Sequence, residues 1–372
     1  MVPYNRQYHK PEDITVEKKE RKKLGTGVKV LLIILGVIAV LLIAALIFIS
    51  AYMEQLLSQV HRIDDVTENT MSQAEYQAFL DSMDETLDPD FSGPILSHED
   101  VTWPAQAEPI ESSDQIINIL LIGQDRRSDE ARTRSDTMIL VTVNKRTDTI
   151  HLTSFMRDMY VEIPTYEKPN RINIPYMLGG MRLLNKTLYE NFGVVVDGNI
   201  EVDFQGFMEI IDMMGGIEVE LTAEEAEYMN LNVNWDVEDG TDKVWNLTEG
   251  VNLLTGSQAL SYARMRKVGN SDFERTERQR RVLTLLIDKA KDLSLTEMNL
   301  LLQHAMPLIR TDLSNSEIID YALELFPMLN DLEVKTLRIP APGTYEAAYV
   351  DGMSVLIPDL EENRKRLQWI MW

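Results

Sequence analysis

The chain has 372 residues, which is enough for one large domain or two modest ones. Sixty acidic residues against 36 basic ones give a formal charge of −24. A nucleic-acid-binding domain needs a basic face, so this composition disfavours one. The chain has no cysteine, so a domain exported from the cell would need no disulfides.

Residues 30–49 form a run of twenty residues without a charge, VLLIILGVIAVLLIAALIFI. At about 1.5 Å per residue, a helix of this length measures about 30 Å and can cross the hydrocarbon core. A buried core helix and a cleaved signal peptide are the alternatives. The apolar part of a signal peptide usually has about 7–15 residues and a small-residue cleavage site behind it. This run is longer and is followed by SAYM. The sequence therefore predicts an uncleaved transmembrane anchor over residues 30–50.

The orientation of this anchor follows from its flanks. Residues 1–29 carry eight Lys or Arg and four acidic residues, whereas the rest of the chain carries 28 basic and 56 acidic ones. The positive-inside rule predicts a cytoplasmic tail over residues 1–29 and an extracellular domain on the other side of the cell membrane.

The segment 51–114 differs in composition from residues 115–372. Residues 51–88 are polar with apolar residues at helical spacing, and residues 88–113 contain four prolines among small and acidic residues. We predict a juxtamembrane stalk and linker over 51–114, and the main extracellular domain over 115–372.

Apolar runs and turn residues in the second part alternate between two kinds of element. β-branched runs predict strands, and longer amphipathic stretches predict helices. The predicted strands are 116–122, 137–143, 149–155, 217–221, 332–339 and 354–357, and the predicted helices are 176–191, 204–214, 256–264 and 272–293. Strands interleaved with helices predict an α/β fold, an αβα sandwich with a mixed central sheet.

Arginines lie beside carboxylates at three predicted strand boundaries. The first strand is followed by Gly-Gln-Asp125-Arg-Arg127, the second is preceded by Arg134-Ser-Asp136, and the third is followed by Arg157-Asp158. Each of these could be an ordinary polar turn. Three at the boundaries of one sheet favour a shared site, where carboxylates ligate a metal and arginines bind phosphate through two parallel hydrogen bonds.

The densest cluster is ALSYARMRKVGNSDFERTERQRR, residues 259–281. Arg264 and Arg266 would point to one side in an extended segment but would diverge in a helix. Asp272, Arg275 and Gln279 share one face of the predicted long helix. Arg278 and Arg281 lie off that face and fit plain surface charge. The alternative for the whole run is an exposed helix with salt bridges to Glu274 and Glu277.

Other motifs are less informative. The chain has no Gly-x-Ser-x-Gly elbow and no Walker loop, and its five histidines are scattered. Five of its methionines fall on helices that should cover the sheet: Met177, Met181, Met208, Met213 and Met214. They fit either a flexible core or an adaptable apolar tunnel for a long lipid chain.

Residues 118–287 resemble the LytR-CpsA-Psr family of bacterial cell-wall glycopolymer ligases. The likeness is carried, in order, by NILLIGQDRR, RSDTMILVTVN, LTSFMRDMYVEIP, RINIPY, VDFQGF, MGGIEVEL and LTGSQALSYARMRKVGNSDFERTERQR. A short basic tail and one anchor agree with the family as well. The family usually has Ser-Ile-Pro-Arg-Asp where this chain has Ser-Phe-Met156-Arg157-Asp158, which leaves the geometry of that loop open.

The resemblance implies a membrane-anchored phosphotransferase. It would move a glycopolymer, such as teichoic acid or capsule, from a polyprenyl-pyrophosphate carrier to peptidoglycan, assisted by Mg²⁺, with the lipid in an apolar pocket. Asp125 and Asp136 match the metal-associated acids, and Asp158 and Asp272 match further acids of the site. The expected pyrophosphate contacts are Arg127, Arg134, Arg157, Arg264, Arg266, Arg275 and Gln279.

Two other functions fit the same residues. A polyprenyl-pyrophosphate phosphatase would use the same groups with water as acceptor. A non-catalytic, membrane-tethered wall-binding module would need a glycan-binding surface but no metal. The paired acids Asp125 and Asp136 favour an enzyme, because acids near a phosphate site are costly without a cation.

Overall fold

The computed structural model describes residues 50–63, 70–82, 87, 89, 91–110, 113–124, 132–232, 244–269 and 271–371. Its contacts divide the chain into two units, Met1–Met53 and Glu54–Trp372. Nearly all of the first unit, including the predicted anchor up to residue 49, lies outside the described residues. Among the helices that are described, none has the length and apolar character needed to span a bilayer.

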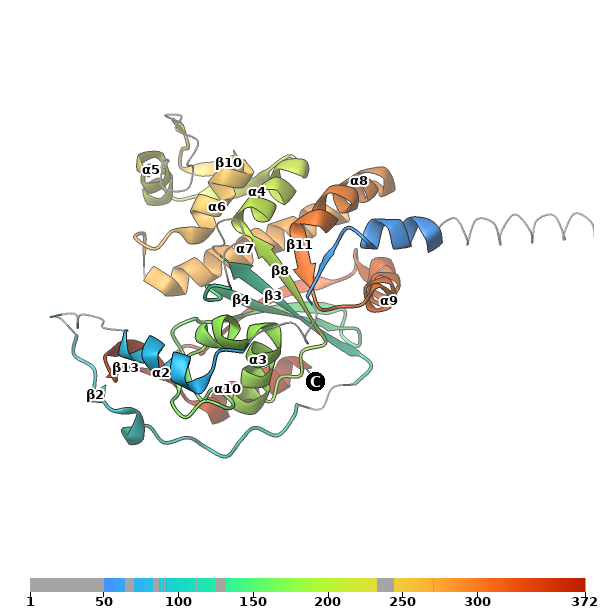
Figure 1. Cartoon of the computed structure of the whole chain (residues 1–372). Coiled ribbons are helices and arrows are strands. Elements are labelled where there is room, and N and C mark those ends of the chain that lie inside the picture. Colours follow the sequence, from blue (N-terminus) through green and yellow to red (C-terminus); the bar gives the residue numbers. More distant parts are fainter. Residues whose placement is uncertain are drawn as a thin grey trace, which may run out of the picture. The chain divides into compact units, whose positions relative to one another are not determined.

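Within the described residues, seven strands of the second unit form one mixed sheet (Figure 1). Their order is β1-β11-β8-β3-β4-β5-β12. Pairing is parallel for β1 with β11, β3 with β8, and β5 with β12, and antiparallel for the other three pairs. The strands are β1 (His61–Arg62), β3 (Ile116–Gln124), β4 (Thr137–Asn144), β5 (Thr149–Phe155), β8 (Gly198–Asp203), β11 (Ile309–Thr311) and β12 (Glu333–Ile339).

Helices cover both faces of this sheet, as the αβα prediction requires (Figure 1). On one face, α3 (Ile174–Phe192) and α10 (Leu360–Met371) bury Leu184, Leu188 and Leu367 against strand residues such as Leu120 and Leu140. On the other face lie α4 (Phe204–Met213), α6 (Gly256–Arg264), α7 (Ser271–Lys291), α8 (Leu295–Ala305) and α9 (Asn315–Leu325). The strands β3, β4, β5 and β12 therefore have one side in each of two apolar layers.

Smaller elements surround the sandwich. A hairpin of β9 (Ile217–Leu221) and β10 (Gly250–Leu254) lies beside α5 (Ala223–Leu231). A three-stranded sheet joins β2 (Ile95–Leu96), β13 (Tyr345–Val350) and β14 (Met353–Pro358), and β6 (Tyr160–Val161) pairs with β7 (Asn170–Arg171). Predicted strands 217–221 and 354–357 are thus strands, but they belong to these peripheral sheets.

Local sequence signals place α4 and α6 where the site needs them. Asp203 caps α4 by accepting a hydrogen bond of 2.8 Å from the Gly206 amide. Thr255 and Gln258 form a capping box at the start of α6. A Cβ at Gly256 would lie 2.1 Å from the Met208 carbonyl oxygen, so only glycine allows α6 to approach α4 this closely.

The segment predicted as stalk and linker packs on the domain over much of its length. Leu56 and Leu57 are buried, and β1 extends the central sheet beside β11. Helix α2 (Gln73–Asp81) buries Tyr76 against α3, and β2 pairs with β13. The compact unit therefore begins at Glu54, well before residue 115, because apolar residues spaced along a polar segment find partners on a domain that the local sequence does not reveal.

Candidate active site

An apolar cavity of about 770 Å³ lies between the sheet and helices α4, α6 and α7. Strands β3, β4 and β8 provide its floor and the three helices its walls. Its apolar lining includes Leu121, Ile139, Ile200, Val202, Phe204, Phe207, Ile210, Leu260, Leu283 and Leu286. A cavity of this size, predominantly apolar with a few polar groups, is typical of a ligand site.

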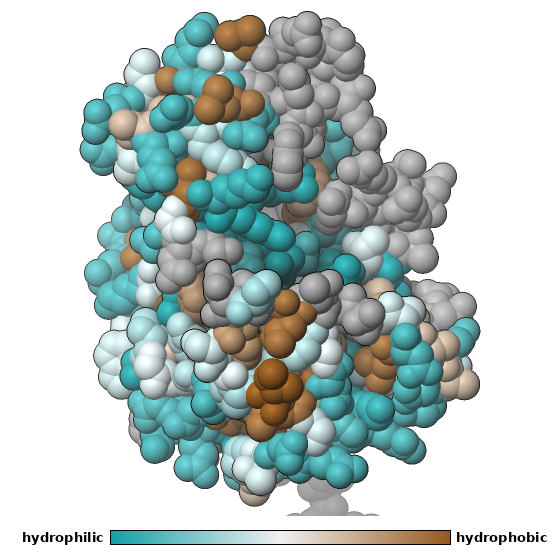
Figure 2. Space-filling view, turned by 90° about the vertical axis from the view of Figure 1, so that its left-hand side faces the viewer, coloured by the Kyte–Doolittle hydropathy of each residue, from teal (hydrophilic) through white to brown (hydrophobic). Residues whose placement is uncertain are grey.

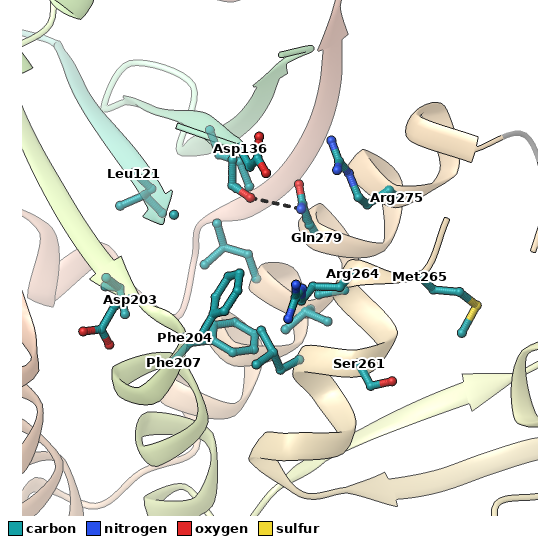
Figure 3. A pocket seen from close by; sticks show the side chains of 18 of the residues that line it. Leu121, Asp136, Asp203, Phe204, Phe207, Ser261, Arg264, Met265, Arg275 and Gln279 are labelled. Atoms are coloured by element: carbon teal, nitrogen blue, oxygen red, sulfur yellow. Dashed lines mark hydrogen bonds between the residues drawn. The ribbon is translucent and has the colours of Figure 1, made fainter. Parts of the chain in front are cut away.

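One part of the cavity wall is charged. Asp136, Arg157, Arg264, Arg266 and Arg275 all line the same cavity as the apolar residues. Figure 3 shows Arg264 and Arg275 projecting from α6 and α7 toward the region between these helices and the end of β3. On the outer face that Figure 2 shows, hydrophilic side chains gather across the middle, with apolar residues exposed below them. Because the guanidinium groups and the apolar residues line the same cavity, a single ligand could contact the former with a charged head and the latter with a tail.

Arg157 is the centre of the charged network. Its Nη1 donates to Asp136 Oδ1 at 3.3 Å and its Nη2 donates to Asp272 Oδ2 at 3.3 Å, while Nε lies 3.4 Å from Asp158 Oδ2. Burial by itself lowers the pKa of Arg157, but these three carboxylates raise it above the ordinary value. The guanidinium of Arg157 thus stays charged, and the three carboxylates Asp136, Asp158 and Asp272 hold it in one orientation.

Asp272 connects the arginines of two further segments. Its Oδ1 lies 3.0 Å from Arg275 Nη2 and 3.6 Å from Arg266 Nε. Burial raises the pKa of Asp272. The positive charges of Arg275, Arg157 and Arg266 together lower it by a larger amount, so the pKa is below the ordinary value. The pKa of Asp158 is raised, chiefly by burial and also by the negative charge of Asp272, against the pull of Arg157. Asp272 is therefore the more firmly ionised of the two acids.

A stability measurement tests this ionisation of Asp272. A carboxyl group whose pKa is lowered by folding contributes stability above its unfolded pKa, about 4, and loses it as pH falls toward the folded value. We expect Asp272→Asn to lower Tm at pH 7, and the difference from the unmodified chain to shrink as pH falls below about 4. A difference that is independent of pH between 3 and 7 would show that Asp272 acts only through its shape.

Arg275 has hydrogen-bonding capacity to spare. Its side chain is almost fully buried, and its Nε has no hydrogen-bond partner among the described residues. Burial, followed by repulsion from Arg157, lowers its pKa to about 10. A buried, unsatisfied donor on a cation is costly, and an anion bound in the cavity would remove that cost.

The chain turns sharply between Arg264 and Arg266, which explains why both face the cavity. Helix α6 ends at Arg264, and Met265 has the extended angles φ −58° and ψ 126°. Met265 also lines the cavity, but its side chain runs in a different direction from that of Arg264 (Figure 3). Arg264 reaches into the cavity and places its Cζ 4.4 Å from the centre of the Phe204 ring. The predicted extended exit segment is therefore present at this point.

Most of the predicted site residues come together. Asp136, Arg157, Arg264, Arg266, Arg275 and Gln279 line the cavity, and Asp158 and Asp272 contact Arg157 from beside it. Gln279 donates to Thr137 Oγ1 at 3.0 Å, as the dashed line in Figure 3 shows. Arg134 is exposed and is not among the lining residues. Asp125 and Arg127 lie outside the described residues.

Comparison with known proteins shows to which family the chain belongs. The sequence pattern of the LytR_cpsA_psr family matches residues 90–368. The chain belongs to the LytR-CpsA-Psr family. A Bacillus cereus relative named polyisoprenyl-teichoic acid–peptidoglycan teichoic acid transferase TagU is 32% identical over 234 residues, which cover 62% of this chain and 71% of that protein.

Solved structures of family members have the same fold. Bacillus subtilis TagV is 27% identical with a TM-score of 0.55, and the match covers 70% of this chain and 98% of that one. A structure described as the LytR-CPS2A-psr family protein YwtF (TagT) with bound octaprenyl pyrophosphate lipid is 26% identical with a TM-score of 0.50, covering 69% and 91%. A family member is thus known to bind a ligand that joins an apolar tail to a pyrophosphate.

The departure from the usual family motif has a structural explanation. The side chain of Met156 is buried in the main core, and its amide donates to the Ile339 carbonyl oxygen at 2.8 Å. A proline at this position would have no amide hydrogen to donate. The backbone before Arg157 is thus fixed by a strand contact and by packing.

Two expectations from the sequence need correction. Arg278 is not surface charge: it is buried, pairs with Glu225 at 2.9 Å, and donates to the carbonyl oxygens of Met265 and Val268. It thereby fixes the segment that carries Arg266. The five methionines do not form the tunnel wall either, since none of them lines the cavity and Met181 is buried on the opposite face of the sheet.

Sequence reasoning also missed partners of the charged residues. Phe204 supports Arg264, Thr137 binds Gln279, and Asn173 Nδ2 lies 3.5 Å from Asp136 Oδ1. Arg171 lies 3.9 Å from Asp158 through its Nε. Phe204, Asn173 and Arg171 belong to the short motifs VDFQGF and RINIPY, so the sequence marked these residues as candidates for the site. It did not indicate which charged side chain each of them would contact.

Among the described residues, no cluster of three or more His, Cys, Asp or Glu side chains could hold a metal ion. Asp136 offers one carboxylate beside the cavity, with its side chain 39% exposed. Mg²⁺ is often bound through one or two carboxylates together with substrate phosphates and water. Among the described residues, Asp136 is thus a single carboxylate that could contribute to a magnesium ion shared with a phosphate ligand, and it also pairs with Arg157 and Arg266.

Proposed function

We propose that the chain transfers a glycopolymer from a polyprenyl-pyrophosphate carrier to peptidoglycan. The observation that supports this most directly is the joining of an apolar cavity to a cluster of arginines in one site. The cavity fits a prenyl tail, and the arginines fit a pyrophosphate, which is the ligand bound to the family member YwtF (TagT). The teichoic acid and peptidoglycan named for the TagU relative supply the donor and the acceptor of the proposal.

The proposed reaction is a phosphoryl transfer. The oxygen of an acceptor hydroxyl forms a bond to the polymer-linked phosphorus, and the bond from that phosphorus to the bridging oxygen breaks. Polyprenyl phosphate leaves with the electron pair, and the hydroxyl proton passes to solvent or to a base. Catalysis of such a transfer consists mainly of positioning and charge stabilisation.

The residues of the site divide this work between them. Arg266 and Arg275 face the cavity and would stabilise the negative charge that grows on the leaving phosphate. Asp272 holds both of them, and Arg157 is held between three acids, so the cations are positioned before the substrate arrives. Mg²⁺ on Asp136 and Asp125 would supply further positive charge to the pyrophosphate oxygens.

We also propose that residues 30–50 anchor the chain, with the N-terminus in the cytoplasm and the domain outside.

A reconstituted assay tests the proposal. The full chain is incubated with lipid-linked polymer, with and without peptidoglycan, and both attached polymer and released polyprenyl phosphate are measured. We expect release to depend on the acceptor. Equal release into water without acceptor would instead identify a lipid pyrophosphatase, and wall binding without any release would identify a non-catalytic module.

The magnesium site makes a separate prediction. Asp136→Asn keeps the size of the side chain but removes its charge, so it should weaken a shared Mg²⁺. We expect the Mg²⁺ concentration for half-maximal transfer to rise about tenfold or more. Identical magnesium titrations for Asp136→Asn and the unmodified chain would exclude Asp136 as a ligand.

A further inference from the structure

We propose that Arg278 is a positioning residue for Arg266 and that Glu225 of α5 acts together with it. Arg278 does not line the cavity, so it acts on a bound pyrophosphate only through the segment that carries Arg266. We call this segment, residues 265–269, the arginine turn. The inference rests on the proposed function, because it concerns how one cation of the pyrophosphate site is held in place.

The arginine turn follows α6 and is anchored in the core on both sides of Arg266. The side chains of Met265 and Val268 are buried in the apolar cluster that β9, α5 and α6 share. Arg266 and Lys267, which lie between them, are exposed. Gly269 ends the turn with a φ of 78°, in the left-handed region that favours glycine. The direction of Arg266 therefore depends on the path that the backbone takes between two buried residues.

The ion pairs of Arg266 with described residues are long. Its Nε lies 3.6 Å from Asp272 Oδ1 and its Nη2 lies 4.0 Å from Asp136 Oδ2, while 44% of its side chain is exposed. These contacts draw the guanidinium toward the cavity, but pairs of this length and exposure hold a flexible side chain only weakly. The position of the Arg266 backbone is therefore needed as well.

Arg278 holds that backbone on both sides of Arg266. Its Nη1 donates to the Met265 carbonyl oxygen at 3.1 Å, and its Nη2 donates to the Val268 carbonyl oxygen at 3.0 Å. The Arg278 side chain is only 6% exposed, so water competes little for these hydrogen bonds. One rigid, planar guanidinium thereby spans the turn from Met265 to Val268 and fixes the separation of its ends.

Glu225 sets the orientation of Arg278 from another helix. Its Oε1 accepts from Arg278 Nε at 2.9 Å, and its Oε2 accepts from the Thr222 amide at 3.1 Å, within the capping box that begins α5. Glu274 Oε2 accepts a further hydrogen bond of 3.1 Å from Arg278 Nη2. Every nitrogen of this guanidinium therefore has a partner, and the planar fork is fixed in one arrangement.

Two other arginines of the site are held by different contacts. Arg264 lies at the end of α6 with its Cζ 4.4 Å from the centre of the Phe204 ring. Arg275 is paired with Asp272 at 3.0 Å within α7 itself. Loss of the Arg278 hydrogen bonds should therefore act on pyrophosphate through Arg266 and leave these two arginines in place.

The mobility of the arginine turn tests the anchor without requiring pyrophosphate or catalysis. The chain has no cysteine, so Lys267→Cys gives the full chain in nanodiscs a single site for a spin label. Arg278→Lys is added to this background, because lysine keeps the charge but cannot reach Glu225 and both carbonyl oxygens at once. Arg280→Lys is the matched control, since Arg280 is also a buried arginine of α7, 7% exposed, and does not line the cavity. We expect the label to become more mobile in Arg278→Lys and to stay unchanged in Arg280→Lys.

The affinity for inorganic pyrophosphate, measured by calorimetry, tests the path through Arg266. We expect Arg278→Lys to weaken binding at least about fivefold, and the double variant with Arg266→Ala to bind within about twofold of Arg266→Ala alone, because coupled residues do not add their effects. If Arg278→Lys does not fold, Glu225→Gln keeps the size of its side chain and removes the charge that orients Arg278. It should weaken binding at least about threefold, and again only while Arg266 is present.

The two measurements separate this proposal from the proposed function. An unchanged label in folded Arg278→Lys, or a loss of affinity that adds in full to that of Arg266→Ala, overturns the positioning role even if the chain proves to be a transferase. A merely structural role would lower Tm and would add its loss in the double variant. Absence of pyrophosphate binding by the unmodified chain overturns the proposed site and this role together.

Discussion

Replacing Arg266 with alanine is expected to lower the rate of polymer transfer at least about a hundredfold while the domain stays folded. Groups that stabilise charge in a transition state typically contribute factors of about 10²–10³. Arg266 faces the cavity with its side chain 44% exposed, so its removal leaves no buried cavity. Asp272 keeps Arg157 and Arg275 as partners. The measurement is the initial rate of polymer attachment at saturating donor and acceptor.

Arg281→Ala is the control for this experiment. Arg281 belongs to the same basic run, has a similarly exposed side chain (42%), and does not line the cavity. We expect it to transfer polymer at nearly the normal rate, and both variants to unfold within a few degrees of the unmodified chain. Equal rates for Arg266→Ala and the unmodified chain would contradict the assignment of Arg266 to the pyrophosphate. Equal losses in both variants would point to overall charge as the cause.

Two of the arginines in the basic run, Arg264 and Arg266, show how far the sequence predicts this site. The spacing of Arg264 and Arg266 predicts a common direction only if the chain leaves the helix between them, and α6 does end there. The stripe of Asp272, Arg275 and Gln279 follows from helical geometry alone, and the structure confirms it through one ion pair and two lining side chains. Local geometry is predictable because it depends only on residues a turn or two apart.

Contacts between distant segments were not predictable in this way. Arg278 lies off the stripe, yet it is buried because α5 brings Glu225 to it. The cavity is lined by Phe207 and Ile210 of α4 and not by the five methionines predicted to lie on the covering helices, because the close contact of Gly256 with Met208 sets how α4 and α6 pack. An amphipathic pattern gives the face that a helix buries but not the gap left between two buried faces. Four strands of the central sheet, β3, β4, β5 and β12, were predicted because their own composition marks them as strands. The other three, β1, β8 and β11, were not predicted.

The second large effect is expected from filling the apolar cavity. Ile210 lies on α4 and lines the cavity, so Ile210→Trp should place an indole ring in the space that the proposal assigns to the prenyl tail. Each buried CH₂ group is worth about 0.8 kcal/mol, so displacing only two of them costs about 1.6 kcal/mol and lowers affinity more than about tenfold. We expect KM for a long-chain polyprenyl donor to rise by at least that factor. A donor analogue with only two isoprene units, which leaves much of the cavity unused, should show a change below about threefold.

Met213→Trp distinguishes this steric effect from a general disturbance of α4. Met213 lies on the same helix, is 39% exposed and does not line the cavity. If the tail occupies the cavity, Ile210→Trp discriminates against the long donor and Met213→Trp does not. Equal loss for the long and the short donor in Ile210→Trp would mean that the substitution displaces Arg264 or Phe204 and not the lipid. Normal KM for the long donor, in a folded variant, would place the prenyl chain outside this cavity and remove the main support for a lipid-linked substrate.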